Sequence, residues 1–329
     1  MLGGLSVAIV QGGPSSEAEV SRASASGVEG ALLAAKHRVA RLELDGSLPE
    51  RLRRAGYDVV FPVAHGHVGE DGSLQGLLEV LDVPYVGSDV LASALAMEKR
   101  FARIVFEHAG LPIAPGFAAI RGDARATADR ARREIGEALV VKPSSQGSAI
   151  GVTRLETGAS AAEVARAIEE VWAIDDFAVV EHFAHGREVT CAVLDLNETL
   201  AFPPTEIFAP LDAFYTYEAR YAPGRSRHVC PADLPAEVAA RVRHVAVEAH
   251  RALGCRDLSR VDLIVGDGER GDAITLLEVN SLPGMTATSL YPECAAAGGW
   301  PMDRLCDALV ARAHVRGTKR RSQARALPR

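Results

Sequence analysis

The strongest constraint on the fold is an alternation of short apolar runs with a helical segment at the start of the chain. Three apolar runs are predicted to be strands: Leu5–Val10, Val39–Leu44 and Tyr57–Ala64. A helix is expected between the first two, beginning at a capping box formed by Ser16 and Glu19. Strands that alternate with helices predict a parallel sheet, in which functional residues gather at the carboxyl ends of the strands. We therefore expect residues 1–87 to form a Rossmann-like α/β domain.

A second domain is expected over residues 88–183. Ser88 is predicted to begin a helix that carries Lys99. Further along the chain, the predicted strands Ala138–Lys142 and Ile150–Leu155 flank a Gly/Ser-rich turn. This order predicts a hairpin in the central domain with a long connecting loop, here called the crown.

A third domain, residues 184–315, is expected to contain a polar loop over residues 211–230. Two apolar strands, Arg260–Val265 and Ala273–Asn280, follow that loop. The last fourteen residues, 316–329, hold six basic groups and no acidic one. Such a segment is typical of a solvated extension, so we expect a disordered tail. The predicted class is α/β, with α+β parts.

Composition restricts the class of protein. The 329 residues are 48% hydrophobic and 24% charged, as in ordinary globular enzymes. The net charge of −7 argues against a general nucleic-acid binder. Five cysteines without a C-x-x-C pair favour a reduced, cytoplasmic protein. We expect no signal peptide and no membrane segment. Only 4 of the 36 basic residues are lysines, so a lysine inside a motif is a candidate for a role that needs a compact ammonium.

The last two predicted strands bring polar side chains together. Side chains alternate along a strand, so Arg260 shares a face with Asp262, and Glu278 shares one with Asn280. A hairpin centred near residue 270 would place Asp262 opposite Glu278. Oxygen-rich sets of this kind suit Mg²⁺, which also takes ligands from substrate phosphates. The alternative is a solvated strand face with a cross-strand ion pair.

The turn Pro143–Ser148 offers backbone N–H groups and hydroxyls that suit phosphate oxygens. Lys142 leads into the turn, and Lys99 lies earlier in the chain. The turn does not match G-x-x-x-x-G-K-[ST], so it is not a P-loop. A mobile hairpin loop without a ligand is the alternative.

Two further motifs follow predicted strands. Residues 12–21 lack G-x-G-x-x-G, which argues against a nicotinamide-dependent dehydrogenase. Within this motif Glu17 either interacts with the helix dipole or receives a substrate ammonium. His65, in a Gly-rich loop, is either placed for binding and proton transfer or is a structural histidine.

Together, these motifs resemble the D-alanine–D-alanine ligase family of the ATP-grasp superfamily, over residues 5–312. The matching segments, in the family's order, are GGPSSEAEVS, HGHVGEDGSLQG, MEK, VKPSSQGSAIGV, YTYEARY, SRVDLIV and LEVNSLPGMTATSL. The resemblance implies an ATP-grasp fold of three domains, with ATP held between the central and C-terminal domains. It also implies two chemical steps. One D-alanine carboxylate attacks the γ-phosphate of ATP, and the amine of a second D-alanine then displaces phosphate from the acyl phosphate.

The resemblance assigns ATP and metal ligands by position. The residues expected to hold the phosphates and to form the lid over them are Lys99, Lys142, Gly147 and Ser148. The residues expected around adenine and ribose are Glu181, Phe183, Ala184 and Glu188. The expected ligands of two Mg²⁺ ions, which Mn²⁺ could replace, are Asp262, Glu278 and Asn280.

The resemblance also assigns residues to the reaction itself. Glu17 would take the ammonium of the first substrate, and Ser148 and Tyr221 would link to it and close the lid. Arg260 and the backbone N–H of Gly284 would stabilise the tetrahedral oxyanion. A tyrosine at position 221 goes with an amine nucleophile in this family, which favours D-alanine over D-lactate as second substrate.

Further substrate contacts are expected from His65, Ser289, Leu290 and Arg220. Three positions depart from the family's commonest pattern, and these are Gln146, Ala18 and Arg220. The departures leave open an ATP-grasp ligase that joins other small amino or hydroxy acids, in antibiotic biosynthesis or resistance. The resemblance implies a homodimer whose small-molecule partners are ATP and D-alanine.

Overall fold

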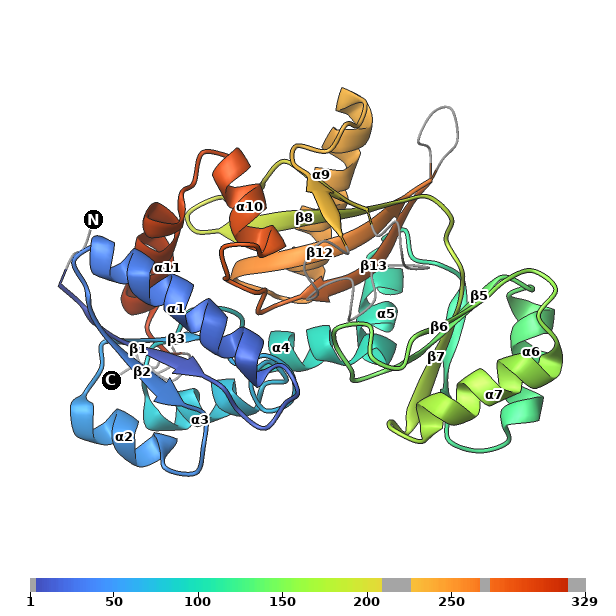
Figure 1. The fold of residues 1–329 in the computed structure, drawn as a ribbon, viewed down its shortest axis with the longest axis horizontal. Coiled ribbons are helices and arrows are strands. Elements are labelled where there is room, and N and C mark those ends of the chain that lie inside the picture. The colour runs from blue at the N-terminus through green and yellow to red at the C-terminus, as the bar shows by residue number, and fades with distance from the viewer. Residues whose placement is uncertain (1–3, 209–225, 267–272, 319–329) are drawn as a thin grey trace, which may run out of the picture.

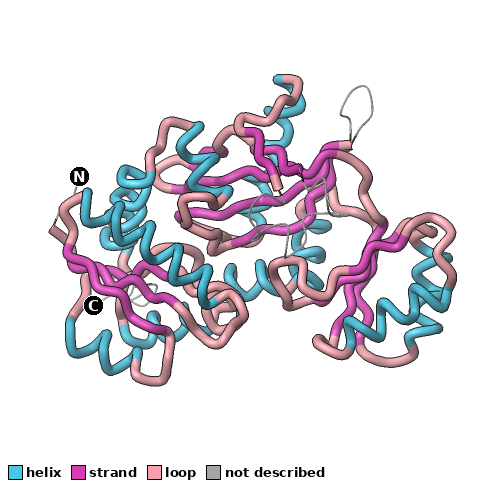
Figure 2. The backbone as a smooth tube through the Cα atoms, viewed as in Figure 1, coloured by secondary structure: helices cyan, strands magenta, loops and turns pink. Residues whose placement is uncertain are grey.

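A computed structural model describes residues 4–208, 226–266 and 273–318 of the chain. Its strands form three separate sheets, which appear as three magenta groups in Figure 2. One sheet is at the N-terminal end, one belongs to the central part of the chain, and one is built mainly from the C-terminal part (Figure 1).

The first sheet is parallel. Its strands, in spatial order, are β2 (Arg38–Glu43), β1 (Ser6–Gln11) and β3 (Val59–Pro62). Its helices are α1 (Ala18–Ala34), α2 (Leu48–Ala55) and α3 (Ser73–Leu81). Alternate side chains of β1 enter two cores, because Val7 and Ile9 pack with residues of α1 while Ala8 and Val10 pack with α2 and α3. The predicted parallel sheet is confirmed.

The predicted start of α1 is wrong in detail. The helix begins at Ala18 with Glu17 as its N-terminal flanking residue, and no side chain caps it. Glu19 accepts a hydrogen bond of 2.6 Å from Arg22 instead of forming a capping box with Ser16. The S-x-x-E spacing was therefore not sufficient to identify the cap.

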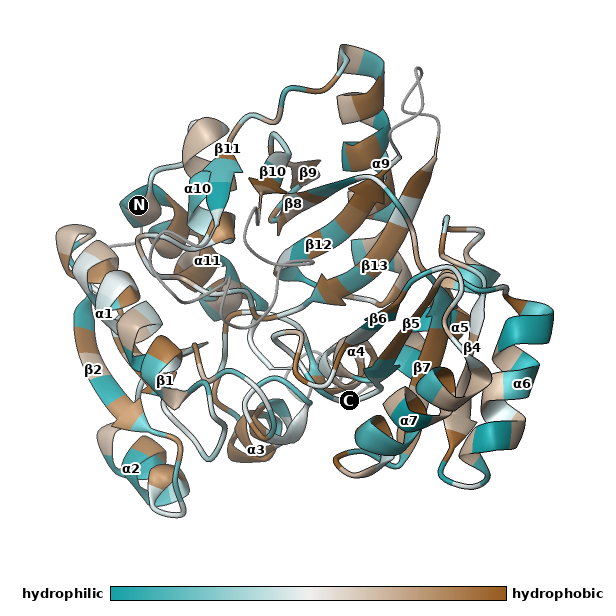
Figure 3. Cartoon of the chain, turned by 45° about the vertical axis from the view of Figure 1, so that its right-hand side comes forward, coloured by the Kyte–Doolittle hydropathy of each residue, from teal (hydrophilic) through white to brown (hydrophobic). Residues whose placement is uncertain are grey.

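The second sheet is antiparallel. Its strands, in spatial order, are β4 (Gly116–Ile120), β7 (Phe177–His182), β5 (Leu139–Pro143) and β6 (Thr153–Leu155). The helices α6 (Ala124–Glu134) and α7 (Ala161–Trp172) pack on this sheet and present polar outer faces (Figure 3). The predicted β5–β6 hairpin is confirmed, with Leu139 opposite Leu155.

Two helices lead from the first sheet to the second: α4 (Val90–Met97) and α5 (Lys99–His108). The prediction that the helix beginning at Ser88 carries Lys99 is wrong, because Lys99 lies on the second of these two helices. Asp89 caps α4, since its carboxylate accepts the N–H of Ala92 at 3.1 Å. The chain is extended at Glu98, and Lys99 is the first residue of α5. The backbone N–H of Lys99 donates to Ser144 O at 2.9 Å, which joins α5 to the end of β5.

The third sheet runs in the order β11 (Arg227–Val229), β10 (Thr205–Phe208), β8 (Arg187–Asp195), β12 (Asp257–Val265) and β13 (Ile274–Asn280), with β9 (Thr199–Ala201) beside β8. The helices in the described residues of this part are α9 (Ala236–Ala252), α10 (Leu290–Ala297) and α11 (Met302–Arg316). Apolar residues of α9 cover one face of β8, β12 and β13 (Figure 3). α10 and α11 share a core with α1, so they join the third sheet to the first.

Two predictions about irregular segments are wrong in part. The predicted polar loop of residues 211–230 contains β11, although residues 209–225 lie outside the described residues. The predicted disordered tail begins too early, because Arg316 ends α11 and Thr318 is buried. The Thr318 hydroxyl donates to Asp82 at 2.5 Å. Residues 319–329 lie outside the described residues.

Candidate active site

The pairing of β12 with β13 has the predicted register. Asp262 lies opposite Glu278, and Arg260 lies opposite Asn280. The register shifts directly after Asp262, so a β-bulge interrupts the ladder here, and pairing resumes from Leu263 opposite Leu276. The alternation of side chains therefore brings four polar groups to one region, as the sequence predicted.

Arg260 and Asp262 are buried and form an ion pair along one strand. The guanidinium donates to both carboxylate oxygens, at 2.9 and 2.8 Å. The hydroxyl of Thr190 on β8 donates to the same carboxylate at 2.6 Å. These bonds fix the direction of the guanidinium, because a bidentate pair tolerates few alternative geometries.

The two lysines of the motifs lie beside carboxylates. Lys99 Nζ donates to Gln146 O at 2.6 Å and lies 3.5 Å from Glu278 Oε2. Lys142 Nζ lies 2.5 Å from Glu181 Oε2. Burial opposes ionisation of Glu181, but the positive charges of Lys142 and Arg103 outweigh it and lower the pKa of this carboxyl.

A cavity of about 610 Å³, here called the nucleotide cavity, opens between the second and third sheets. It is lined by most of the residues expected to bind the nucleotide and by two of the expected metal ligands. These are Lys99, Lys142, Glu181, Phe183, Ala184, Glu188, Asp262 and Glu278. Six of the eight residues expected to bind ATP thus meet in one cavity, and its size is in the range of small-molecule sites.

A second cavity of about 470 Å³, here called the amino-acid cavity, opens toward the first sheet. Its lining includes the remaining described residues that the resemblance singled out. These are Glu17, His65, Gly147, Ser148, Arg260, Asn280, Gly284, Ser289 and Leu290. Lys99 and Glu278 line both cavities, so the two spaces adjoin at these side chains. Tyr221 and Arg220 lie outside the described residues.

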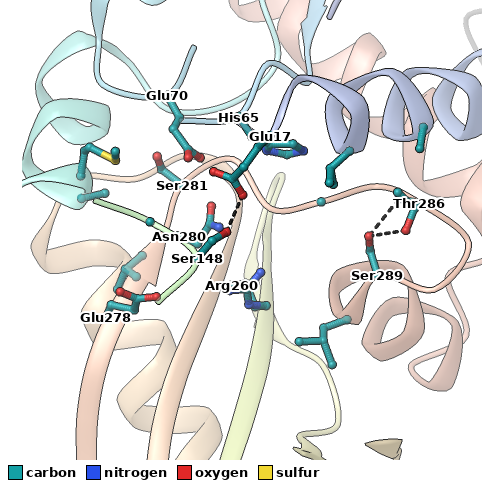
Figure 4. Close-up of a pocket in the computed structure, with 18 of the residues that line it drawn as sticks. Glu17, His65, Glu70, Ser148, Arg260, Glu278, Asn280, Ser281, Thr286 and Ser289 are labelled. Carbon is teal, nitrogen blue, oxygen red and sulfur yellow. Dashed lines mark hydrogen bonds between the residues drawn. The ribbon is translucent and has the colours of Figure 1, made fainter. Parts of the chain in front are cut away.

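The crown, residues 144–152 between β5 and β6, extends across the amino-acid cavity and contacts the first domain. The Ser148 hydroxyl donates to Glu17 Oε1 at 2.5 Å, as Figure 4 shows. Ser148 and the following Ala149 both have positive φ angles, of 51° and 57°. Non-glycine residues rarely adopt this conformation, so the contact with Glu17 and its neighbours holds the crown in a specific shape.

His65 lies at the carboxyl end of the first sheet, beside Glu17 (Figure 4). Burial lowers the pKa of His65, with Glu17 acting in the opposite direction and Arg260 in the same direction as burial. Its Nε2 lies 3.4 Å from the hydroxyl of Ser24 on α1. The imidazole is therefore neutral near pH 7 and offers one donor and one acceptor.

Ser289 and Gly284 border the opposite side of the amino-acid cavity. Ser289 is the N-cap residue of α10, and its hydroxyl accepts the N–H of Thr286 at 3.0 Å. A Cβ at position 284 would lie 2.9 Å from the Ser289 hydroxyl, so glycine permits the close approach of this turn. Ser289 and Leu290 both line the cavity, so the N-terminal end of α10, which favours anions such as a substrate carboxylate, borders it.

The metal ligands expected from the resemblance have suitable chemistry. Among the described residues, no three or more His, Cys, Asp or Glu side chains form a complete metal cluster. The expected set contains two carboxylates and one amide, Asp262, Glu278 and Asn280, which adjoin the shared wall of the two cavities. Such a set fits a divalent cation that completes its shell with ATP phosphates and water.

Comparison with known proteins identifies the family. A model of the D-ala D-ala ligase C-terminus matches residues 105–311, and a model of the D-ala D-ala ligase N-terminus matches residues 47–88. The chain belongs to the D-alanine–D-alanine ligase family. Membership of this family implies that the protein is a ligase that uses ATP and a divalent metal ion.

Relatives of this ligase match it over nearly their whole length. A D-alanine–D-alanine ligase of Geotalea uraniireducens is 42% identical over 310 residues, which are 94% of this chain and 96% of that protein. One of Geobacter sulfurreducens is 44% identical over 289 residues, 88% of this chain and 87% of that protein.

Solved structures agree with the ATP-grasp fold of this ligase. The D-alanine–D-alanine ligase of Coxiella burnetii superposes with a TM-score of 0.83 at 28% identity, covering 98% of this chain and 97% of that one. A D-Ala:D-Ser ligase of Enterococcus faecalis gives 0.80 at 29% identity, covering 94% and 99%. The predicted fold class is confirmed.

Sequence reasoning missed two charged residues of the ligase. Glu70 lines the amino-acid cavity and accepts the N–H of Gly66 at 2.7 Å. Burial, with the negative charge of Glu17 next in size, raises the pKa of Glu70 to about 8. The second residue, Arg103, contacts Glu181 from α5. Its position four residues after Lys99, on one face of a helix, was the available signal.

Proposed function

We propose that this ligase joins two D-alanines to D-alanyl-D-alanine, with conversion of ATP to ADP and phosphate, as a step in the supply of peptidoglycan precursors. The names and the 42% and 44% identities of the relatives support this reaction. The observation that carries the proposal is the common wall of the two cavities at Lys99 and Glu278. A nucleotide in one cavity can thus meet an amino acid in the other.

The first step is phosphoryl transfer. The carboxylate of the first D-alanine attacks the γ-phosphorus, the bond to the ADP oxygen breaks, and an acyl phosphate forms. Glu17 holds the ammonium of this substrate, and Lys99 and Lys142 hold the ATP phosphates. Two Mg²⁺ ions, or Mn²⁺ in their place, would screen the phosphate charges when bound. The residues that hold them in this proposal are Asp262, Glu278 and Asn280.

The second step forms the peptide bond. The amine of the second D-alanine attacks the acyl carbonyl, loses a proton, and expels phosphate as the C–O bond breaks. Arg260 and the Gly284 N–H stabilise the oxyanion of the tetrahedral intermediate. The bidentate bond of Arg260 to Asp262 supports this role, because the donor is already oriented before the charge develops.

The remaining residues bind and enclose the substrates. Adenine and ribose contact the set Glu181, Phe183, Ala184 and Glu188. Substrate carboxylates and backbone contact the set His65, Ser289, Leu290 and Arg220. Gly147 and Ser148 close over the γ-phosphate, and Ser148 joins Glu17 and Tyr221 in one hydrogen-bonded set. The 2.5 Å bond between Ser148 and Glu17 supports the closed arrangement.

The proposal extends to organisation and assembly. The domains are residues 1–87, 88–183 and 184–318, the last extended to include the packed Thr318. The ligase acts as a homodimer in the cytoplasm, where ATP is available, and its small-molecule partners are ATP and D-alanine. In the described part of the chain, no helix combines the length and apolar character that a membrane span requires.

The test is a product assay with a substrate panel. Purified ligase, ATP and Mg²⁺ are incubated with D-alanine, D-serine, D-lactate and L-alanine, alone and in pairs, and phosphate release and product mass are measured. We expect D-alanyl-D-alanine as the main product. Turnover with D-alanine plus D-serine or D-lactate, without D-alanyl-D-alanine, would overturn the substrate assignment and favour a ligase of specialised metabolism. Absence of ATP-dependent phosphate release with every pair would overturn the reaction class.

A further inference from the structure

Glu181 on β7 is a buried carboxylate that lies between two cations. Lys142 on β5 approaches Oε2 at 2.5 Å, and Arg103 on α5 donates to Oε1. Both pairs are almost fully removed from solvent, because the side chains of Arg103, Lys142 and Glu181 are only 14%, 9% and 9% exposed. Each oxygen of the carboxylate thus has its own positively charged partner.

The two cations occupy different positions relative to the nucleotide cavity. Lys142 and Glu181 line that cavity, whereas Arg103 is not among the described residues that line it. Arg103 contacts the other oxygen of Glu181 from α5. It lies on the same face of that helix as Lys99, about 6 Å further along the helix axis. A ligand in the cavity can therefore reach Lys142 but contacts Arg103 only through Glu181.

Arg103 is anchored independently of Glu181. Its Nη2 donates to Ala114 O at 3.0 Å, in the segment that leads into β4. Two residues later, Gly116 pairs with Glu181 across β4 and β7. A Cβ at position 116 would lie 2.9 Å from Glu181 Cγ and 2.5 Å from Val180 O, so the strand leaves room for the Glu181 side chain. The surrounding backbone therefore supports one geometry for this pair.

We propose that Arg103 is a positioning residue for the nucleotide, as the permanent counter-ion of Glu181. Lys142 is then the exchangeable partner, which leaves Glu181 for the phosphates when ATP enters. The inference rests on the proposed function, in which Lys142 binds phosphate and Glu181 borders adenine. The inference adds a residue that contacts neither the nucleotide nor the amino acids.

The physical reason is the cost of an uncompensated buried charge. A buried carboxylate that loses one of two cations keeps a partner, but one that loses both is strongly destabilised or takes up a proton. Without Arg103, Glu181 has no cation beside it once Lys142 turns to ATP, so it takes up a proton. Its protonated oxygen then donates a hydrogen bond, and the carboxyl is a weaker acceptor for the adenine amino group.

The variants isolate the charge at position 103. Arg103→Met removes the charge while keeping an unbranched side chain, and Arg103→Lys keeps the charge. Arg121→Met is the matched control, since this arginine lies at the end of β4 with its side chain 55% exposed and pairs with Asp176 at 3.3 Å on the surface. ATP and inosine triphosphate affinities are measured by titration calorimetry without D-alanine, and KM for D-alanine is measured separately.

We expect Arg103→Met to weaken ATP binding about ten- to hundredfold, because one partner of a buried pair is removed. Inosine triphosphate, whose 6-oxo group can accept from a protonated Glu181, should lose less, and KM for D-alanine should change less than about twofold. Arg103→Lys should restore most of the ATP affinity, and Arg121→Met should bind ATP like the wild type.

A second comparison separates positioning from a general structural role. In a Glu181→Gln background there is no carboxylate to neutralise, so adding Arg103→Met should change ATP affinity by less than about twofold. Equal weakening in both backgrounds, equal loss for both nucleotides, or no rescue by lysine would overturn the proposal. Because binding is measured without amino acids, failure to form D-alanyl-D-alanine would refute the proposed function without deciding this inference.

Discussion

Removal of Arg316 should destabilise the junction between the first and third domains. This residue, within the segment predicted to be a disordered tail, donates to the carboxylate of Asp257 and to Tyr85 O at 2.7 Å. The side chain of Asp257 is 1% exposed, and its other oxygen accepts the N–H of Gly87 at 2.8 Å. Arg316→Met leaves this buried carboxylate without a positively charged partner among the described residues.

The size of the effect follows from these contacts. Breaking a buried ion pair by removing one partner costs about 3–5 kcal/mol. Arg316 is 17% exposed and the Gly87 N–H remains, so water and one hydrogen bond compensate in part. We therefore expect a loss near the lower limit, about 3 kcal/mol, from a free energy of unfolding of about 5–15 kcal/mol. Asp257→Asn combined with Arg316→Met should lose much less, because no buried charge is left.

Urea unfolding followed by tryptophan fluorescence can measure this loss locally. The chain has two tryptophans, Trp172 in the central domain and Trp300 directly before α11. A Trp172→Phe background therefore reports unfolding through Trp300, which packs against the core that α11 shares with α1. Arg251→Met is the control, because this arginine is 55% exposed and pairs only at the surface of α9. A loss below about 1 kcal/mol, or an equal loss whether or not the Asp257→Asn substitution is also present, would refute the reasoning.

Three further predictions concern the site. Glu278→Gln should lower ATP-dependent phosphate release at least about a hundredfold, because a metal ligand is lost, and wild-type rates would mean that the metal set is misassigned. Ser148→Ala removes the bond to Glu17, worth about 1.5–3 kcal/mol for a charged acceptor, and should lower kcat/KM about ten- to hundredfold. An unchanged kcat/KM would show that the closed crown is not required. The raised pKa of Glu70, about 8 against an ordinary 4.5, means that its contribution to stability is present below pH 4.5 and is lost as pH rises to about 8. The Tm of Glu70→Gln should therefore rise relative to wild type between pH 5 and 8, and a pH-independent difference would contradict this.

The sequence allowed the metal-side geometry to be predicted in detail. Two apolar strands with a short connection have few alternative pairings, and period-two alternation then fixes which side chains share a face. The positions of Asp262 and Glu278 opposite each other followed directly. The same reasoning could not show that Arg260 and Asp262 bond to each other, because that depends on rotamers and on Thr190 from another strand.

Other elements were missed for physical reasons. The strand β4 is a five-residue run, GFAAI, too short to show a clear period, and the helix α6 carries alanines and arginines rather than a strong apolar pattern. The position of the break between α4 and α5 was misplaced, because it depends on Glu98, whose extended backbone has no marker such as glycine or proline. Arg103 was missed because its partner, Glu181, is 78 residues away in the sequence.

The ion pairs of the site have a consequence for association kinetics. The cations expected to meet ATP or the oxyanion are already matched with carboxylates in the chain, as the pairs Lys99 with Glu278, Lys142 with Glu181, and Arg260 with Asp262. MgATP therefore approaches a balanced array of charges rather than a strong positive field. Long-range attraction should be weak, so the association rate constant should change little with ionic strength. The slow part of binding is then the exchange of partners inside the site.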